Sequence, residues 1–398
     1  MQKIIGFGLL LLVVAVLLIY NRDKLIRPNA VNHLFDRENI IQNFQNMDAI
    51  FDVSQVNVPK ESVPIPKSSQ SYHLPDSFIV NSRVSNVADY LEVTATEGLL
   101  IIQHDSILYE SYHLDLEPGE LHISWSMSKS FVSLLIGMLV DDGKLDLGTE
   151  VQEILPQFTG SGYDGVTVKH LLNMSSGVQF NEDYGDFNSD INRFGRAFAL
   201  GTSLEDFALT LNNDKTPGTY NHYVSIDTQV LGLLIRKITG QSITQLTQER
   251  IWEPMGMECP GTWIIDSTGM EVVLGGMNAC LRDYAKLGLL YLNDGFYNGK
   301  QIVSKSWIDA SLTPDAPHLK PNTPELSSSL YGYGYQWWLP QYPENDFFAT
   351  GIYNQFVYVN RDKDLVITKL SADARYRNDK VAIKAGHIDF FQALAKEF

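Results

Sequence analysis

An apolar run from Phe131 to Val140 would cover almost the whole circumference of a helix, which is typical of a central, buried helix. The run ends at Asp141-Asp142-Gly143-Lys144, where a glycine stands in the usual helix-stopping position. A second apolar helix is predicted from Val230 to Ile238, and it closes with Thr239-Gly240. The chain between about 120 and 260 is therefore predicted to be mainly helical, with polar loops.

Segments rich in β-forming residues lie on both sides of this helical region. Gly98–Gln103 and Ser106–His113 predict two strands joined by a turn at His104-Asp105. Gln355–Asn360 and Leu365–Leu370 predict a second pair, separated by a hairpin-like turn. We therefore expect an α+β fold in which N- and C-terminal strands meet in one antiparallel sheet flanked by helices, with the helical region inserted between them.

Residues Ile4 to Tyr20 carry no charge, and Lys3 and Arg22 bracket them. This length is at the short end for a membrane-spanning helix. A cleaved secretory signal is the alternative, but no small-x-small cleavage site follows promptly. We expect residues 1–21 to form an uncleaved transmembrane anchor. Lys3 precedes the stretch but Arg22, Lys24 and Arg27 follow it, so the positive-inside rule leans weakly towards a cytoplasmic body.

The segment between this stretch and the first predicted strands has a different character. Phe35–Phe44 could form a short amphipathic helix, and the proline- and serine-containing stretch Val58–Ser69 is typical of an extended linker. We expect residues 22–84 to be a membrane-proximal spacer and linker. Residues 85–398 are expected to form one compact domain, which opens with a helix at Asn86–Glu92.

The chain has 30 Lys and Arg residues against 47 Asp and Glu residues, a formal net charge of −17. This charge argues against a polyanionic partner, and no basic stripe with interleaved aromatic residues is present, so nucleic-acid binding is not expected. Hydrophobic residues make up 44% of the chain and charged residues 19%. These proportions are those of a globular protein rather than a disordered one.

The two cysteines, Cys259 and Cys280, have no Cys-x-x-Cys or zinc-type spacing. They could form a disulfide in an oxidising compartment, but two unpaired, buried small residues are the favoured interpretation. The histidines are scattered at intervals unlike a metal-ligand motif. We therefore expect no metal and no other cofactor.

Ser126 stands three residues before Lys129, at the point where the first apolar helix opens. Residues i and i+3 share a helix face, so the Lys129 amine can reach the Ser126 hydroxyl. Burial lowers the pKa of a lysine towards neutrality, and the uncharged amine can then accept the serine proton. Unpaired N–H groups at the helix N-terminus can stabilise a developing oxyanion. The pattern favours an acyl-transfer enzyme, although a structural helix with a polar N-cap serine would show it too.

Acyl transfer also needs a group that protonates the leaving group. Tyr223-Val224-Ser225 follows a Pro217-Gly218 turn and precedes the second apolar helix, so this loop can place a phenol and a second hydroxyl beside Ser126. The other Tyr-x-Ser or Tyr-x-Asn matches lie inside predicted strands or helices, or in a charged stretch. A packed core tyrosine is the structural alternative for Tyr223.

A second oxyanion donor is required as well. Thr350-Gly351 precedes Ile352 at the end of an aromatic-rich segment. A glycine at a strand edge lets a substrate approach closely, and an adjacent N–H can point at its carbonyl oxygen. Taken alone, Thr350-Gly351 is read by default as an ordinary turn.

In this order, Ser126-x-x-Lys129, Tyr223-x-Ser225 and Thr350-Gly351 resemble the three motifs of the serine β-lactamase and penicillin-binding-protein superfamily. The most similar branch is the class C-like serine hydrolases, which include esterases, D-amino-acid peptidases and 6-aminohexanoate-dimer hydrolases. The resemblance covers about residues 95 to 398. Supporting matches lie at His170–Gly177, Gly275–Ala279, Arg282–Gly288 and Tyr331–Gly334.

The resemblance implies a β-lactamase-like fold, with Ser126 as the acylated nucleophile and Lys129 as its base partner. It implies that Tyr223 handles the leaving-group proton and that the Ser126 N–H is one oxyanion donor. Whether Lys129 or Tyr223 removes the serine proton is disputed within the superfamily and stays open. The implied substrate and oxyanion residues are Ser225, Thr350, Gly351 and, through its backbone N–H, Ile352.

Two positions depart from the superfamily pattern. The second motif commonly ends in asparagine, whereas Ser225 stands here, a variant similar to the amide-hydrolase branch. The third motif commonly begins with lysine or histidine, whereas Ala349 stands here. The change removes a cation that would help to hold a carboxylate, so we expect poor β-lactamase activity.

Together these motifs predict a serine hydrolase that cleaves a small ester or amide through a covalent acyl-enzyme. The alternatives are a catalytically silent binding or sensor protein of the same fold, and a D,D-peptidase or β-lactamase. The resemblance favours an extracytoplasmic hydrolase domain, periplasmic in a Gram-negative cell, and outweighs the charge bias around the anchor. The expected partners are a small-molecule substrate and the membrane.

Overall fold

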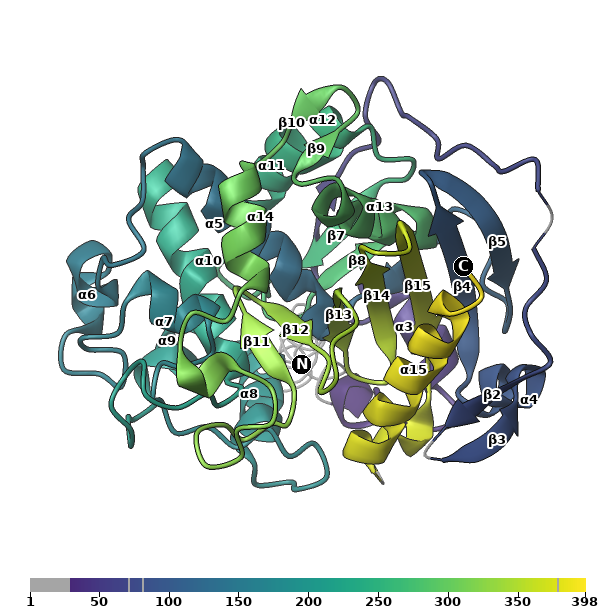
Figure 1. Cartoon of the computed structure of the whole chain (residues 1–398). Coiled ribbons are helices and arrows are strands. Elements are labelled where there is room, and N and C mark those ends of the chain that lie inside the picture. The colour runs from purple at the N-terminus through teal and green to yellow at the C-terminus, as the bar shows by residue number, and fades with distance from the viewer. Residues whose placement is uncertain (1–28, 71, 81, 378) are drawn as a thin grey trace, which may run out of the picture.

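The computed structural model of the chain describes residues 29–70, 72–80, 82–377 and 379–398. Its largest sheet has seven antiparallel strands in the order β11-β12-β13-β14-β15-β4-β5. Because β15 pairs with β4, strands from the two ends of the compact domain meet in one sheet, as predicted (Figure 1). The strands are β4 (Thr96–Gln103), β5 (Ser106–Tyr112), β11 (Gly332–Gly334), β12 (Trp337–Leu339), β13 (Asp346–Gly351), β14 (Gln355–Asn360) and β15 (Leu365–Ser371).

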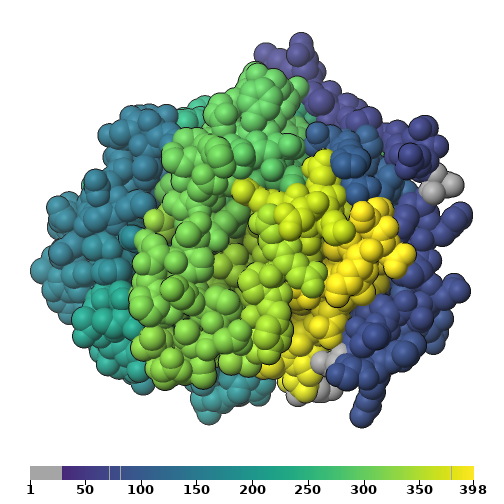
Figure 2. Space-filling view, viewed as in Figure 1, coloured from purple at the N-terminus to yellow at the C-terminus, as the bar shows by residue number. Residues whose placement is uncertain are grey.

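Helices cover both faces of this sheet. Alternating side chains along β4 send Leu100 into one hydrophobic cluster and Leu99 into another. The first face packs against α13 (Leu281–Leu292), and the second packs against α15 (Lys380–Ala395), which lies in front of β14 and β15 in Figure 1. In the space-filling view, α15 (yellow) also lies against the hairpin of β2 (Ser77–Val80) and β3 (Arg83–Asn86), in dark blue (Figure 2).

The inserted region is helical, as predicted, and α5 runs through its core. Every residue of α5 from Lys129 to Leu139 is buried, which explains why its sequence has no polar face. The helix that precedes β4, α4 (Val87–Val93), confirms the prediction for Asn86–Glu92. The α-helices between β6 (His122–Ile123) and β11 are α5 (Lys129–Asp141), α6 (Val151–Ile154), α7 (Val168–Leu172), α8 (Asp190–Ala199), α9 (Leu204–Leu209), α10 (Ser225–Thr239), α11 (Ile243–Thr247), α12 (Glu253–Met255), α13 and α14 (Lys305–Leu312).

The expectation of a spacer over residues 22–84 requires a correction for its described part. Strand β1 (Val53–Val56) pairs with β7 (Gly261–Ile264) in a second sheet of order β1-β7-β8-β6, which β8 (Met277–Ala279) and β6 (His122–Ile123) complete. The short helix α3 (Ile40–Gln45) buries Ile40 and Phe44 in the main core. The helix predicted over Phe35–Phe44 overlaps α3, but α3 and β1 are packed into the domain because their short apolar segments have partners that lie far away in the sequence.

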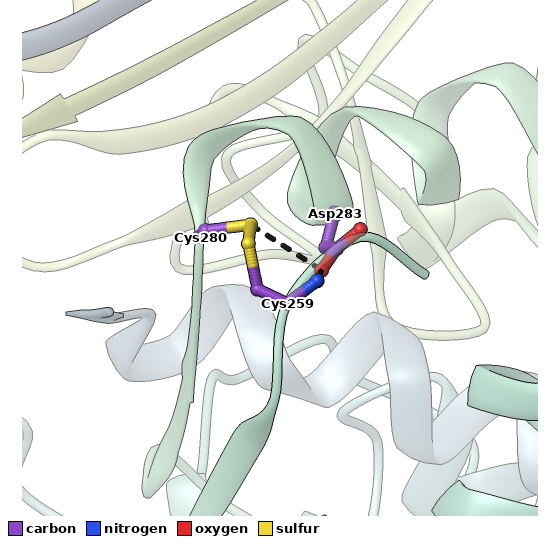
Figure 3. A group of neighbouring side chains, drawn as sticks. All are labelled: Cys259, Cys280 and Asp283. Carbon is purple, nitrogen blue, oxygen red and sulfur yellow. Dashed lines mark hydrogen bonds between the residues drawn. A yellow bond between two sulfur atoms is a disulfide. The ribbon is translucent and has the colours of Figure 1, made fainter. Parts of the chain in front are cut away.

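The two cysteines are joined, so the expectation of unpaired thiols was wrong. Cys259 and Cys280 form a disulfide with their Cα atoms 6.3 Å apart (Figure 3). Cys259 precedes β7 and Cys280 follows β8, and the antiparallel pairing of these strands brings the two residues together. The carboxylate of Asp283 lies beside the disulfide and accepts the backbone N–H groups of Glu258 and Cys259 at 2.7 and 2.9 Å.

Within residues 29–398, positions 71, 81 and 378 aside, no helix has the length and apolar character needed to cross a membrane. The predicted anchor, Ile4–Tyr20, lies outside the described residues and stays a prediction.

Candidate active site

Ser126 lies in a tight 3₁₀ turn, η2 (Trp125–Ser128), that leads directly into α5. Trp125 has a φ of +45°, a left-handed conformation that is rare for a bulky side chain. Its ring packs against Phe35 and Phe44, with centroids 5.4 Å away in each case. The N-terminal segment therefore helps to hold the strained turn that presents Ser126.

The amine of Lys129 lies within hydrogen-bond distance of three oxygen atoms. Its Nζ is 3.0 Å from Ser126 Oγ and 3.3 Å from Ser225 Oγ, and it donates to the carbonyl oxygen of Leu274. A neutral amine has two N–H donors and one lone pair. With the carbonyl of Leu274 and the hydroxyl of Ser225 accepting the two donors, the lone pair is left to accept the Ser126 proton.

Burial of Lys129 favours this neutral form. The side chain is almost inaccessible to solvent, and desolvation lowers its pKa to about 7. The negative charges of Glu182 and Asp227 oppose this effect and raise the pKa. The amine is thus poised to change its charge near neutral pH, as expected of a general base.

Tyr223 lies on the other side of the nucleophile. Its hydroxyl interacts with the side chains of Ser126 and Ser225, and its ring is 5.3 Å from Lys129 Nζ. Burial raises the pKa of Tyr223 well above 10, and the charge of Glu182 raises it further. The phenol therefore stays protonated at neutral pH and can act as a proton donor.

The end of β13 faces the nucleophile turn. A Cβ atom on Gly351 would lie 2.2 Å from the carbonyl oxygen of Ser124 and 3.0 Å from Trp125 Cβ, so only glycine fits here. Ile352 follows in the turn to β14, where Tyr353 has a φ of +60°. This turn is held from outside by Phe35, whose ring stacks on Tyr353 at 4.7 Å.

Two depressions meet at Ser126 and Ile352, which line both. The first, here called the apolar cavity, has a volume of about 300 Å³. Most of its lining is apolar: Val31, Leu34, Phe35, Phe51, Trp125, Phe187, Ile191, Phe194, Phe198, Ile264, Val272 and Leu274. Its polar lining residues include Asn32, Tyr184, Asn192, Arg196 and Arg377. The second, here called the charged groove, has a volume of about 600 Å³. Its wall includes Glu182, Asp183, His222, Tyr223, Tyr331, Trp338, Thr350, Gly351, Tyr376, Lys380 and Lys384.

The structure brings all the predicted site residues together. Ser126, Lys129 and Ser225 are linked by the hydrogen bonds of the lysine amine, and Tyr223 contacts both serines. The three residues from the third motif, Thr350, Gly351 and Ile352, line the charged groove beside Ser126. Their chemical roles remain predictions.

The sequence did not identify Glu182, which interacts with most of the residues of this site. Its Oε1 accepts the backbone N–H of Ser225 at 2.6 Å, and its Oε2 accepts the Tyr184 hydroxyl at 3.2 Å. Its charge raises the pKa values of both Lys129 and Tyr223. The only sequence signal was the acidic stretch around Glu182 and Asp183, which is common in surface loops.

Sequence reasoning also missed a buried acid behind the lysine. Asp227 is fully buried on α10, and its Oδ1 accepts the Tyr163 hydroxyl at 3.1 Å. Desolvation raises the pKa of Asp227 well above its usual value. It follows Ser225 by two residues, but nothing in the local pattern separates it from an exposed acid in the first turn of a helix.

A comparison with family models matches residues 86–387 to the family described as Beta-lactamase. Among curated proteins, the 6-aminohexanoate-dimer hydrolase of Paenarthrobacter ureafaciens is 28% identical over 299 residues, which is 73% of this chain and 76% of that protein. Penicillin-binding protein 4 of Amycolatopsis lactamdurans is 31% identical over 154 residues, which is 38% of each chain.

Solved structures give the same fold. A Bacillus anthracis protein described as a candidate 6-aminohexanoate-dimer hydrolase superposes with a TM-score of 0.80 at 24% identity, over 91% of this chain and 96% of that one. A family VIII carboxylesterase superposes with a TM-score of 0.55 at 16% identity, over 76% of this chain and 95% of that one. At these identities the likeness concerns the fold alone.

Proposed function

Because the chain belongs to the Beta-lactamase family and is a serine hydrolase of esters or amides, we propose a more specific substrate. In this proposal the substrate joins an apolar acyl group to a polar leaving group. The observation that supports this proposal is the position of Ser126 between the apolar cavity and the charged groove. Tyr223 lines the groove and not the cavity, so a leaving group that it protonates departs into the groove. The acyl group then occupies the apolar cavity.

In the proposed reaction, Ser126 Oγ attacks the substrate carbonyl carbon while its proton passes to Lys129 Nζ. Lys129 is the better base of the two candidates, because its pKa is lowered to about 7 while that of Tyr223 is raised above 10. The oxyanion accepts hydrogen bonds from the backbone N–H groups of Ser126 and Ile352.

The bond to the leaving group then breaks, and the leaving nitrogen or oxygen takes the Tyr223 proton. Tyr223 regains a proton from the Lys129 ammonium, which returns the amine to its neutral form. Water next attacks the acyl carbon with Lys129 accepting its proton, and the acid product leaves as Ser126 is reprotonated. The Ser126 Oγ and Lys129 Nζ atoms that exchange the first proton are 3.0 Å apart, and the cycle ends with the starting protonation states.

A fluorophosphonate probe tests the nucleophile. Wild type and Ser128→Ala should be labelled, whereas Ser126→Ala should not. Ser128 is a matched control because its hydroxyl donates to the Val273 carbonyl and the residue lines neither the cavity nor the groove. Absence of label on folded wild type would favour the silent binding protein of the same fold.

A series of p-nitrophenyl esters tests the acyl side. The kcat/KM value should rise about fourfold for each added methylene until the cavity is filled, because burying a methylene contributes about 0.8 kcal/mol. A rate that falls from acetate onwards would contradict an acyl group bound in the apolar cavity. Rapid turnover of penicillins with little ester hydrolysis would instead favour the D,D-peptidase or β-lactamase alternative.

We further propose that residues 1–21 anchor the chain in a membrane and that the hydrolase domain is extracytoplasmic, periplasmic in a Gram-negative cell. The Cys259–Cys280 disulfide supports this location, because disulfides persist in oxidising compartments. Deletion of residues 1–21 should release the protein into the soluble fraction. Full protection of the intact chain from added protease in spheroplasts would contradict the extracytoplasmic location.

A further inference from the structure

The apolar cavity reaches the molecular surface between the N-terminal segment and α8. Val31 and Phe35 line it on the N-terminal side, and Phe187, just before α8, lines it on the other. The Phe187 side chain is 66% exposed although it lines the cavity. The exposed lining residues Asn32, Phe187 and Arg377 therefore mark the opening of the cavity, here called the mouth.

A second exposed apolar side chain lies beside the mouth. Leu200, at the C-terminal end of α8, is 68% exposed, and its N–H donates to the carbonyl oxygen of Arg196 one turn earlier. Arg196 in turn donates from Nη1 to the carbonyl oxygen of Phe187 at 2.7 Å. Residues i and i+4 share a helix face, so Phe187 and Leu200 flank Arg196. Large apolar side chains that gather at a cavity opening indicate an interaction surface.

The charges that line the apolar cavity are positive in the described part of the chain. Arg196 and Arg377 are its two charged lining residues, although the whole chain has a net charge of −17. The Cζ atom of Arg196 is 3.9 Å from the centroid of the Phe187 ring, and that of Arg377 is 5.0 Å from the centroid of the Phe35 ring. Arg377 Nε also donates to the Tyr353 hydroxyl at 2.8 Å. The mouth therefore offers two guanidiniums and exposed apolar surface to an anionic, partly apolar partner.

The acidic residues next to α8 do not neutralise these arginines. Glu182 and Asp183 line the charged groove, and Asp186 lines neither depression. Asp190 is paired with Arg193, whose Nη1 lies 2.6 Å from its Oδ1. Among the described residues, no carboxylate lies within ion-pair distance of either guanidinium at the mouth.

The place where the described chain begins indicates what this partner is. Asn29 stands two residues before Val31, so the chain enters the domain beside the cavity. Eight residues separate Asn29 from the uncharged stretch of residues 4–20. Eight residues span at most about 30 Å. A membrane anchor in that stretch would therefore keep the mouth close to the bilayer surface.

We propose that the mouth docks on the surface of a bilayer that contains anionic phospholipids. Phe187 and Leu200 then lie at the level of the headgroups, where aromatic and aliphatic side chains are favoured. The guanidiniums of Arg196 and Arg377 bind lipid phosphates, which accept paired hydrogen bonds from arginine. This inference rests on the proposed function, from which it takes the membrane anchor and the binding of the acyl group in the cavity. The acyl chain of a lipid-borne substrate would enter the cavity directly from the bilayer.

The test measures amide hydrogen exchange of the full chain in nanodiscs of phosphatidylcholine, with and without phosphatidylglycerol, and in detergent. Exchange in residues 184–200 reports docking at the mouth. The β2–β3 hairpin reports an alternative docking face, because its paired residues Ile79 and Val84 are exposed and it lies well apart from α8 in Figure 1.

Two sets of variants separate the contributions of charge and apolar surface. Arg196→Gln/Arg377→Gln removes both guanidiniums, and Arg196→Lys/Arg377→Lys keeps their charge. The control Arg83→Gln/Lys300→Gln removes the same charge from exposed residues of β3 and β10 (Lys300–Gln301) that line neither depression.

For the apolar surface, Phe187→Ser is compared with Phe296→Ser. Phe296 is an exposed phenylalanine on β9 (Phe296–Tyr297), and it lines neither depression. Phe187→Ser should speed exchange of residues 184–200 about tenfold in both kinds of disc, because it removes an aromatic side chain from the interface. Phe296→Ser should leave this exchange as in wild type.

In wild type, exchange of residues 184–200 should be slower in discs with phosphatidylglycerol than in discs without it, by roughly fivefold for each arginine. The ratio of the two rates should fall close to one in Arg196→Gln/Arg377→Gln. Most of the ratio should remain in the lysine variant, and the Arg83→Gln/Lys300→Gln control should match wild type. Taking the ratio within one variant cancels any change that the substitution makes to the loop itself.

Equal exchange in both discs and in detergent, or slower exchange in the hairpin instead, would overturn the proposal. Slowing that is independent of lipid and rises with protein concentration would identify a second copy of the chain as the occupant, and would overturn it too. A full chain that does not enter the discs would refute the anchor together with the docking. Lipid-dependent slowing in a protein that hydrolyses no ester would support the docking and count against the proposed hydrolysis alone.

Discussion

Gly351 and the carbonyl oxygen of Ser124 approach so closely that a Cβ atom on the glycine would lie 2.2 Å from that oxygen. Ser124 is itself fixed, because its N–H and its hydroxyl both donate to the Met277 carbonyl at 2.8 Å. The end of β13 and the nucleophile turn are therefore in backbone contact. Ile352 follows Gly351 directly, and it lines the same depressions as Ser126.

The substitution Gly351→Ala should separate these two segments. We expect kcat/KM to fall at least about 100-fold, because a displacement of the order of 1 Å in an active site has this effect. Ester hydrolysis measures the loss, and near-ultraviolet circular dichroism checks that the aromatic core is intact. Wild-type activity in a folded Gly351→Ala protein would show that the contact does not position the oxyanion site.

The activity should depend on the ionisation of Lys129. Its pKa is lowered to about 7 by burial, and only the neutral amine accepts the Ser126 proton. The kcat/KM value should therefore fall about tenfold per pH unit below this pKa and level off above it. A pH profile of ester hydrolysis measures this limb. A rate that is flat or decreasing across the neutral range would refute the role of Lys129 as the base.

The charge of Glu182 should tune this profile. A nearby negative charge favours the ammonium form and raises the pKa of Lys129, so Glu182→Gln should lower that pKa and move the acid limb to lower pH. The amide oxygen of glutamine can still accept the Ser225 N–H. Asp183→Asn is the matched control, and the acid limb of its pH profile should coincide with that of wild type. A shift to higher pH in Glu182→Gln would contradict the electrostatic coupling.

The proton of Tyr223 should matter most for poor leaving groups. Tyr223→Phe should reduce amide hydrolysis about 100-fold or more, whereas p-nitrophenyl esters should lose less than about tenfold, because p-nitrophenolate departs without a proton. The ratio of the two losses is the measurement, and Tyr220→Phe in the same loop is the control. Equal losses for both substrates would point to a positioning role for the phenol.

The disulfide should contribute to stability rather than to chemistry. Cys259 and Cys280 are 21 residues apart, and a cross-link of this loop length contributes about 3 kcal/mol to the free energy of unfolding. The double variant Cys259→Ala/Cys280→Ala should lose this amount in urea denaturation while keeping its kcat/KM. A loss of activity without a loss of stability would assign the disulfide to the site.

The sequence by itself determined the local elements, because their signals are local. The apolar periodicity from Phe131 to Val140 predicted α5. The β-rich pairs at the two ends of the domain predicted the strands that meet where β15 pairs with β4. The pair Ser126 and Lys129 was visible for the same reason, since three residues along one helical turn are close in any helix.

Only the tertiary structure decided what surrounds these elements. Glu182, Asp227 and Lys384 reach the site from three different segments, and no spacing in the chain relates any of them to Ser126. The disulfide depends on the pairing of β7 with β8, and Phe35 reaches Trp125 from a segment that composition alone assigned to a spacer. Burial and long-range contacts are properties of the packed chain, so the pKa of Lys129 and the two-sided shape of the site could not be predicted from the sequence.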